Sequence, residues 1–132
     1  MHFRIQIVPS GDYDEVVRRV LEHVQADPRI LYLSAGRLAS SLVFCEDAED
    51  AADNRKRYEE RDALDPWLGL VRISPRGLLL DQECSEEQRS LLVSFGKWVL
   101  QAFAPCRVRD VDTAEDLTTR ASEDPDGLFN EI

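Results

Sequence analysis

Histidine is almost absent from this sequence of 132 residues, which contains only His2 and His23. Imidazole is the side chain that proteins most often use for acid–base chemistry near neutral pH, so few candidates for that chemistry remain. His23 lies between Val20 and Val24 in a helical pattern, and we expect it at the boundary or on the solvent side of that helix. No Gly-x-Ser-x-Gly or Cys–His signature of a nucleophile is present. We therefore expect the protein not to be an enzyme.

Sequence motifs for metals and phosphate groups are also missing. The acidic stretch 46–53 lacks the central glycine and terminal glutamate of a calcium loop, and the set Asp110, Asp112 and Asp116 fits such a loop no better. The six glycines are scattered and form neither a G-x-G-x-x-G motif nor a P-loop. The sequence therefore predicts no metal and no cofactor.

Long apolar runs and a leader segment are lacking as well. Met1 is followed directly by the alternating residues Phe3, Ile5 and Ile7, without the basic and apolar regions of a signal peptide. No run reaches the roughly 18 apolar residues that a membrane span needs. Three widely spaced cysteines with no C-x-x-C pair are typical of reduced thiols. They are Cys45, Cys84 and Cys106. We expect a cytoplasmic protein that does not bind membranes.

Acidic residues are abundant, and the formal net charge is −10. This charge repels phosphate backbones and anionic bilayers, so nucleic acid and membrane surfaces are poor partners. The same charge attracts a cationic protein and speeds its association. Solubility is the simpler explanation of an acidic composition, and it remains an alternative to a role in binding.

The first half of the chain has clear periodic patterns. Alternation over residues 2–8 predicts a half-buried strand, and Asp12 begins a helix that ends by Pro28. The apolar runs 30–33 and 37–45 flank a short loop with glycine and predict a hairpin. Its second strand is apolar on both faces, which indicates a central strand. The charged stretch 46–65 is expected to form an exposed helix, with a mobile excursion as the alternative.

The second half predicts a further hairpin, a long helix and a final strand. Residues 68–73 and 78–80 flank a Ser-Pro-Arg-Gly turn. A capping box at Ser85 begins a helix with an apolar stripe, and residues 106–111 alternate as a peripheral strand does. Residues 113–121 are expected to form a short helix anchored by Leu117, followed by a turn at 124–127.

Together these elements predict one α+β domain over residues 1–132. Two main helices pack on one face of a mostly antiparallel sheet of five to six strands, in the order β-α-β-β-[α]-β-β-α-β. Two segments stand out from this core by their charge. They are the charged excursion 46–65 and an acidic C-terminal segment, 112–132, that we expect to be partly mobile.

The leading hypothesis is an acidic module that captures a basic protein, as an immunity- or antitoxin-type inhibitor of a bacterial toxin such as a nuclease does. Trp67 follows Pro66 in acidic surroundings, which is the composition of an interface anchor with a charged rim; a tryptophan that caps the sheet edge is the alternative. The expected partner-binding residues are Glu46, Asp47, Glu49, Asp50, Asp53, Tyr58, Glu59, Glu60, Asp62, Trp67, Asp110, Asp112 and Asp116.

Two other functions stay open. A small ligand-binding or enzymatic domain would hold an anion with converging arginines. The candidates are Arg72, Arg76, Arg107 and Arg109. A regulatory or adaptor subunit would instead use an exposed apolar patch on its long helix, and a homo-oligomer would be one form of that pairing.

Overall fold

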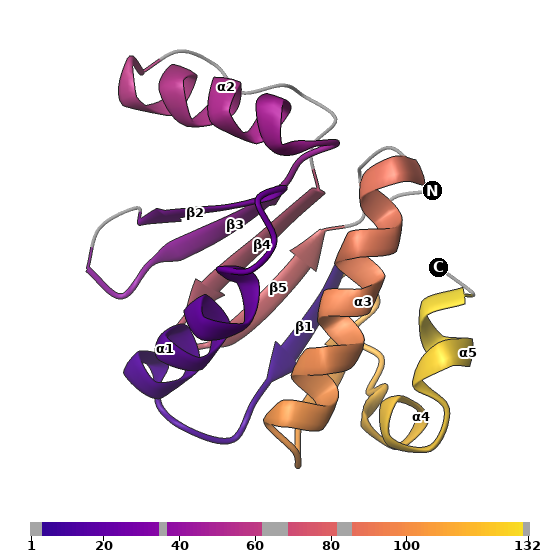
Figure 1. The fold of residues 1–132 in the computed structure, drawn as a ribbon. Helices are drawn as coiled ribbons and strands as arrows, with labels where there is room; N and C mark the ends of the chain where they lie inside the picture. Colours follow the sequence, from indigo (N-terminus) through magenta and orange to yellow (C-terminus); the bar gives the residue numbers. More distant parts are fainter. Residues whose placement is uncertain (1–3, 35–36, 62–68, 82–85, 131–132) are drawn as a thin grey trace.

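The fold belongs to the α+β class. A computed structural model describes residues 4–34, 37–61, 69–81 and 86–130. In these residues six strands form one antiparallel sheet in the order β2-β3-β4-β5-β1-β6, and five helices surround it (Figure 1). The strands are β1 (Arg4–Val8), β2 (Ile30–Ser34), β3 (Ser40–Phe44), β4 (Gly69–Ser74), β5 (Gly77–Asp81) and β6 (Arg107–Asp110). The predicted α+β class with a mostly antiparallel sheet is confirmed.

The main core lies between the sheet and two helices, α1 (Tyr13–Val24) and α3 (Glu86–Ala102), which cover what we call the first face (Figure 1). Helix α1 begins where the Asp12 side chain accepts a hydrogen bond from the Glu15 N–H at 2.9 Å, as its capping position predicts. It buries Val16, Val20 and Val24 at helical spacing. The two helices on one face are therefore where the sequence places them.

The opposite, second face is covered at the β2 end by α2 (Ala48–Glu59). A smaller cluster joins Ala51 of α2 to Leu31, Leu33, Val43 and Cys45. Strand β3 thus contributes to both cores, because its alternate residues Leu42 and Phe44 belong to the main one. This confirms the predicted central strand.

The two hairpins differ from the prediction in one place. Residues Ser74 and Gly77 pair across a two-residue turn, and Gly77 has φ +116°, so the β4–β5 turn lies as predicted. Strand β3, however, begins at Ser40 and not at residue 37. Leu38 has φ +59° and is 44% exposed, so it belongs to the connection. Part of that connection, residues 35–36, lies outside the described residues.

The C-terminal segment forms two short helices, α4 (Thr118–Glu123) and α5 (Pro125–Asn130), which pack beside α3 (Figure 1). The predicted helix over 113–121 is wrong in its start, because residues before Thr118 fold back along β6. The predicted turn at 124–127 is also wrong: Asp124 caps α5 by accepting from the Gly127 N–H at 3.0 Å. Leu128 and Phe129 complete the main core.

Candidate functional site

Helix α2 carries the first group of predicted site residues and is formed by them. Asp47 is the N-cap, and its side chain accepts a hydrogen bond from the Asp50 N–H at 2.7 Å. Asp50 accepts in turn from the Glu46 N–H, one residue before the N-cap, at 3.2 Å. The two aspartates thus bind backbone N–H groups at the start of the helix, in a variation on the capping box. Carboxylates at this end also complement the helix dipole.

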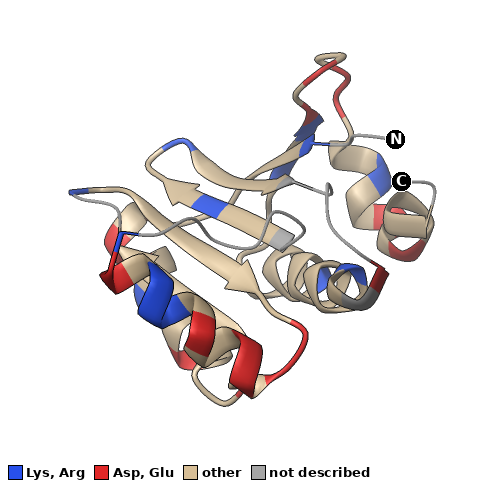
Figure 2. Cartoon of the chain, turned by 90° about the horizontal axis from the view of Figure 1, so that it is seen from above, with Lys and Arg blue, Asp and Glu red and all other residues tan. Residues whose placement is uncertain are grey.

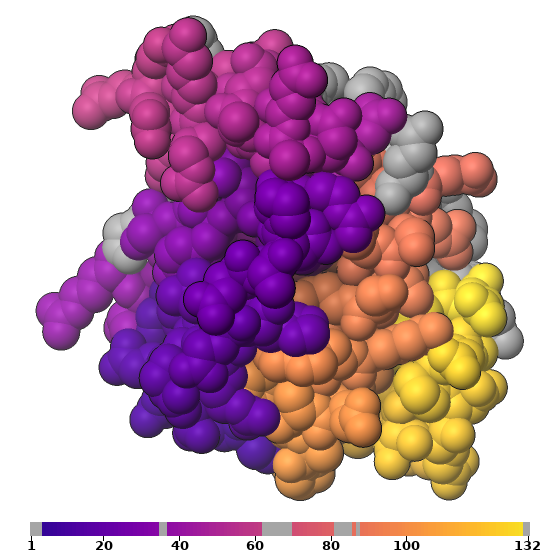
Figure 3. Space-filling model, in the orientation of Figure 1, coloured from indigo at the N-terminus to yellow at the C-terminus, as the bar shows by residue number. Residues whose placement is uncertain are grey.

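These carboxylates gather on one surface. Asp47, Glu49, Asp50 and Asp53 border a shallow hollow of about 540 Å³, and Lys56 borders it as well. With the adjacent Glu46 they make up the acidic surface of α2. Figure 3 shows α2 at one end of the molecule, away from the C-terminal helices. The surface is open to a large partner.

The rest of α2 mixes charges and adds one aromatic side chain. Asp53 forms an ion pair with Arg57 at 3.2 Å one turn on. Tyr58 is 40% exposed, and its hydroxyl donates to the Ser34 carbonyl at 3.1 Å. Glu59 and Glu60 are exposed at the end of the helix. The predicted residues Asp62 and Trp67 lie outside the described residues.

The second predicted group consists of Asp110, the last residue of β6, and of Asp112 and Asp116 in the loop that follows. The Asp110 carboxylate accepts from the backbone N–H groups of Asp112 and Thr113 at 2.9 and 3.0 Å. Hydrogen bonds from Thr118, together with the nearby Arg107, hold the pKa of Asp116 below its ordinary value. Two of these three carboxylates therefore stabilise the loop itself.

The structure does not bring the two acidic groups together. The acidic surface of α2 lies beside β2, at one edge of the sheet, and the loop follows β6, at the other. Five strand spacings separate these edges, or about 24 Å. Figure 2 shows acidic residues on α2 and in the loop after β6 at opposite ends of the molecule. A small partner would contact one group and not both.

Three arginines of the alternative hypothesis, Arg72, Arg107 and Arg109, share one face of the sheet, and Arg76 lies in the β4–β5 turn. Arg72 of β4 and Arg109 of β6 occupy one cross-strand row with Leu79 and Gln6 between them. The Arg109 Nε donates to Gln6 Oε1 at 2.8 Å, and Gln6 Nε2 donates to the Arg76 carbonyl at 2.9 Å. Arg107 and Arg109 border a hollow that Asp116 also borders. A carboxylate therefore shares this hollow with the two guanidinium groups.

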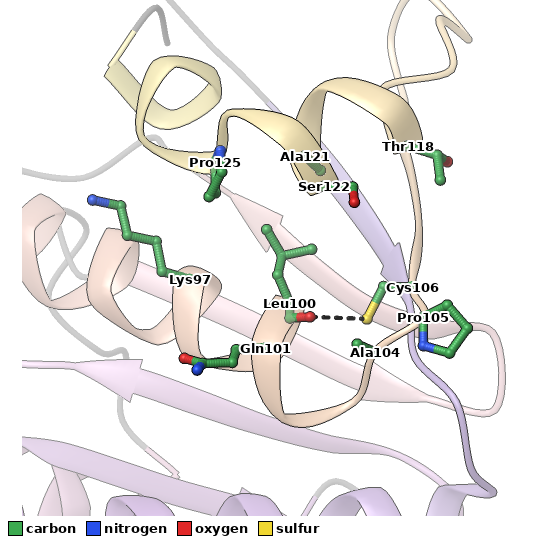
Figure 4. A pocket seen from close by; sticks show the side chains of 10 residues that line it. All are labelled: Lys97, Leu100, Gln101, Ala104, Pro105, Cys106, Thr118, Ala121, Ser122 and Pro125. Atoms are coloured by element: carbon green, nitrogen blue, oxygen red, sulfur yellow. Dashed lines mark hydrogen bonds between the residues drawn. The ribbon is translucent and has the colours of Figure 1, made fainter.

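A further groove lies between α3 and α4, with Lys97, Leu100, Cys106 and Pro125 among its lining residues (Figure 4). Its volume is about 490 Å³. Burial raises the pKa of the Cys106 thiol, whose S–H donates to backbone carbonyls of α3 and of Phe103, at 3.3 Å in the latter case. The thiol is thus held protonated and unreactive.

His23 is placed at the boundary, as its spacing predicts. Its ring stacks on Trp98 with 3.8 Å between centroids and 4° between planes. Trp98 is only partly buried and packs against the main core with Phe95 and Phe103. Burial against this cluster lowers the pKa of His23, so the neutral imidazole predominates at neutral pH.

Within the described residues, no three side chains of the His, Cys, Asp and Glu types are placed to hold a metal ion. None of the helices in that part of the chain combines the length and apolar character that crossing a bilayer requires. Comparison of the chain with protein-family models, curated proteins and solved structures finds no significant match.

Sequence reasoning missed one feature, a groove of about 570 Å³ along the outer edge of β2, which we call the β2 groove. It is bordered by Leu21 and Val24 of α1, residues 30–32 of β2, and Ala51 and Arg55 of α2. It is built by residues 21–32, which lead from α1 into β2, and by residues 48–55 of α2. The only signal in the sequence is the run of small alanines on α2, which leaves room beside the strand.

Proposed function

We propose that this chain is a protein-binding module that captures a basic protein on the acidic surface of α2. The observation that carries the proposal is the gathering of four carboxylates around one hollow on an outlying helix. In a chain of net charge −10, such a surface steers a cationic partner toward one end of the molecule. The module acts by binding and not by catalysis.

The surroundings of this surface support an interface. Tyr58, 40% exposed near the other end of the same helix, supplies an aromatic group next to the exposed Glu59 and Glu60. Interfaces commonly combine such an anchor with a polar rim. The acidic loop after β6 is too far away to share a small partner with α2, so we restrict the docking residues to α2.

The partner class that fits this surface is a toxin with a cationic cleft, and a nuclease is the main example, because nucleases bind phosphate backbones. An inhibitor that covers the cleft would act in the bacterial cytoplasm as an immunity-type protein. Within the described residues Cys106 is a free thiol, which agrees with a reducing compartment.

The test neutralises two carboxylates that have no capping role. The variant Glu49→Gln/Asp53→Asn leaves the hydrogen bonds of Asp47 and Asp50 at the start of α2 intact and changes the net charge by two. The immobilised chain is used to recover a partner from a lysate of the source cells. We expect a basic protein whose association rate with the variant falls roughly tenfold at 0.1 M salt.

The matched control, Asp112→Asn/Glu115→Gln, makes the same change of charge on exposed residues at the other edge of the sheet. We expect it to reduce the association rate less than threefold, because its groups lie about two Debye lengths from α2 at 0.1 M salt. A partner that binds both variants equally, or that is indifferent to salt, would contradict the proposal.

A further inference from the structure

The β2 groove lies at the open edge of the sheet. Leu31 points to the second face and Tyr32 to the first, and both border the same hollow. Because β2 is the edge strand, a hollow that is bordered by residues from both faces of the sheet lies along the outer edge of β2. Helix α1 forms one wall and α2 the other.

The register of the β2–β3 pair shows which backbone groups face this groove. The Cys45 N–H donates to the Arg29 carbonyl at 2.9 Å, so the pairs Leu31–Val43 and Leu33–Ser41 exchange hydrogen bonds along the ladder. The residues between them, Ile30, Tyr32 and Ser34, therefore direct their N–H and C=O groups outward.

The ends of this edge are tied within the chain, but its middle is not. The Ile30 N–H donates to the Asp27 carbonyl at 3.2 Å, and the Ser34 carbonyl accepts from Tyr58. Four groups remain: the Ile30 C=O, the Tyr32 N–H and C=O, and the Ser34 N–H. In the described part of the chain none of the four has a hydrogen-bond partner.

The opposite edge of the sheet is closed by the chain itself. The Leu117 N–H donates to the Val108 carbonyl at 2.8 Å, the Val108 N–H donates to Thr118 Oγ1 at 3.0 Å, and the Asp110 N–H donates to the Glu115 carbonyl at 2.9 Å. Proteins usually protect sheet edges in this way, because an open edge is a template for pairing with another chain. Among the described residues, none protects the middle of the β2 edge in this way.

We propose that β2 is completed by an extended segment of the basic partner, which adds to the sheet beside β2 and parallel to it. This inference rests on the proposed function, because the acidic surface of α2 selects the partner. Strand addition of this kind supplies affinity through main-chain hydrogen bonds and specificity through alternate side chains.

The parallel direction follows from the four open groups. In parallel pairing, two alternate residues of the incoming strand bond to the Ile30 C=O, the Tyr32 N–H and C=O, and the Ser34 N–H. Each of the four open groups then has a hydrogen-bond partner, and each of the two incoming residues makes both of its backbone hydrogen bonds. Antiparallel pairing would also call on the Ile30 N–H and the Ser34 C=O, which already have partners.

A second copy of the chain is the less suitable occupant. A twofold axis normal to the sheet would pair two β2 strands antiparallel, which conflicts with the open groups. Charge gives the same answer: Ala52 borders both the β2 groove and the acidic hollow, so a segment in the groove lies next to the carboxylates. Basic side chains complement that neighbourhood, whereas a second acidic chain is repelled.

The experiment uses the full chain and a blocked hexapeptide of alternating arginine and valine. Amide hydrogen exchange is followed by NMR at low salt, with a glutamate–valine hexapeptide as charge control. We expect the arginine peptide to slow exchange of the Tyr32 and Ser34 amides at least tenfold and the glutamate peptide to leave them unchanged, because only a paired N–H is protected.

A pair of variants at Ser34 isolates the backbone contribution. Ser34→Pro removes one open N–H at an exposed edge position that tolerates proline, and Ser34→Ala retains it. We expect peptide affinity to fall several-fold in the proline variant and to stay the same in the alanine variant.

Two outcomes would overturn the inference, and they differ in whether the proposed function is also contradicted. A peptide that perturbs the α2 amides without protecting Tyr32 rules out strand addition but leaves acidic docking intact. A peptide that binds nowhere on the chain at low salt, or that binds no better than its glutamate counterpart, contradicts strand addition and the proposed function together.

Discussion

At the scale of single residues, Ser40 joins two elements of the core. Its hydroxyl lies 2.7 Å from the hydroxyl of Tyr13 on α1 and 2.7 Å from that of Tyr32 on β2. Ser40 itself is 3% exposed, so all of its polar contacts are made inside the protein. A buried hydroxyl with two partners orients both tyrosines and so aligns α1 with the sheet.

We predict that Ser40→Ala lowers the free energy of unfolding by about 1–2 kcal/mol, because two partly buried tyrosine hydroxyls lose a shared partner. Urea denaturation measures the change. The control is Ser41→Ala on the second face, where we expect an effect within about 0.5 kcal/mol. Equal losses in the two variants would contradict a special role for the Ser40 hydroxyl.

At the scale of elements, the helices differ in how they are held. Helix α1 buries three valines, whereas α2 buries only Ala51 and Asn54 and is defined by its caps and charges. Helix α5 depends on a close approach to α3 at Gly96, where an added Cβ would lie 2.7 Å from Cζ of Phe129 and 3.0 Å from Cδ2 of Leu80. Both neighbours are fully buried.

We predict that Gly96→Ala destabilises the protein by about 1–3 kcal/mol, although the same change in an open helix stabilises by about 1 kcal/mol. The reason is steric overlap with the Phe129 ring. Thermal denaturation and hydrogen exchange in α5 measure the effect. Gly96→Ala combined with Phe129→Leu should recover part of the loss; a stabilised single variant would contradict the close approach.

At the scale of the whole molecule, the negative net charge is the main long-range effect on stability. Many of the acidic residues lie on the two outer edges of the sheet, and the net charge of −10 makes the compact state repel itself. Ion pairs on the surface, such as Arg18–Glu22 at 3.1 Å, are exposed and contribute little to stability. Repulsion between like charges is therefore the larger long-range effect.

We predict that raising sodium chloride from about 10 mM to 300 mM increases the unfolding free energy by about 1 kcal/mol, or the Tm by roughly 3 °C, as screening reduces that repulsion. Differential scanning calorimetry checks this, with sucrose at equal osmolarity as the control. A Tm that falls with salt would show that attractive pairs outweigh the repulsion.

Local patterns in the sequence predicted the elements with strong periodicity. The Asp12 cap, the valine stripe of α1 and the alternation of β1 each follow from contacts within a few residues. The predicted bounds for residues 113–127 were wrong, because packing against β6 and α3 decides their conformation. The strand prediction for Leu38 was wrong because its backbone has φ +59° and leaves the extended conformation. The predicted exposed helix within 46–65 is present as α2, yet its place beside β2 had no local signal.

The sequence by itself determined the α+β class, the acidic charge and most helix and strand positions, since these depend on composition and on neighbours along the chain. Only the tertiary structure decided that the two acidic groups lie at opposite edges of the sheet. It also decided that the β6 edge is closed, while four groups of the β2 edge have no partner among the described residues. Strand order and register are set by contacts between distant segments, and no local pattern encodes them.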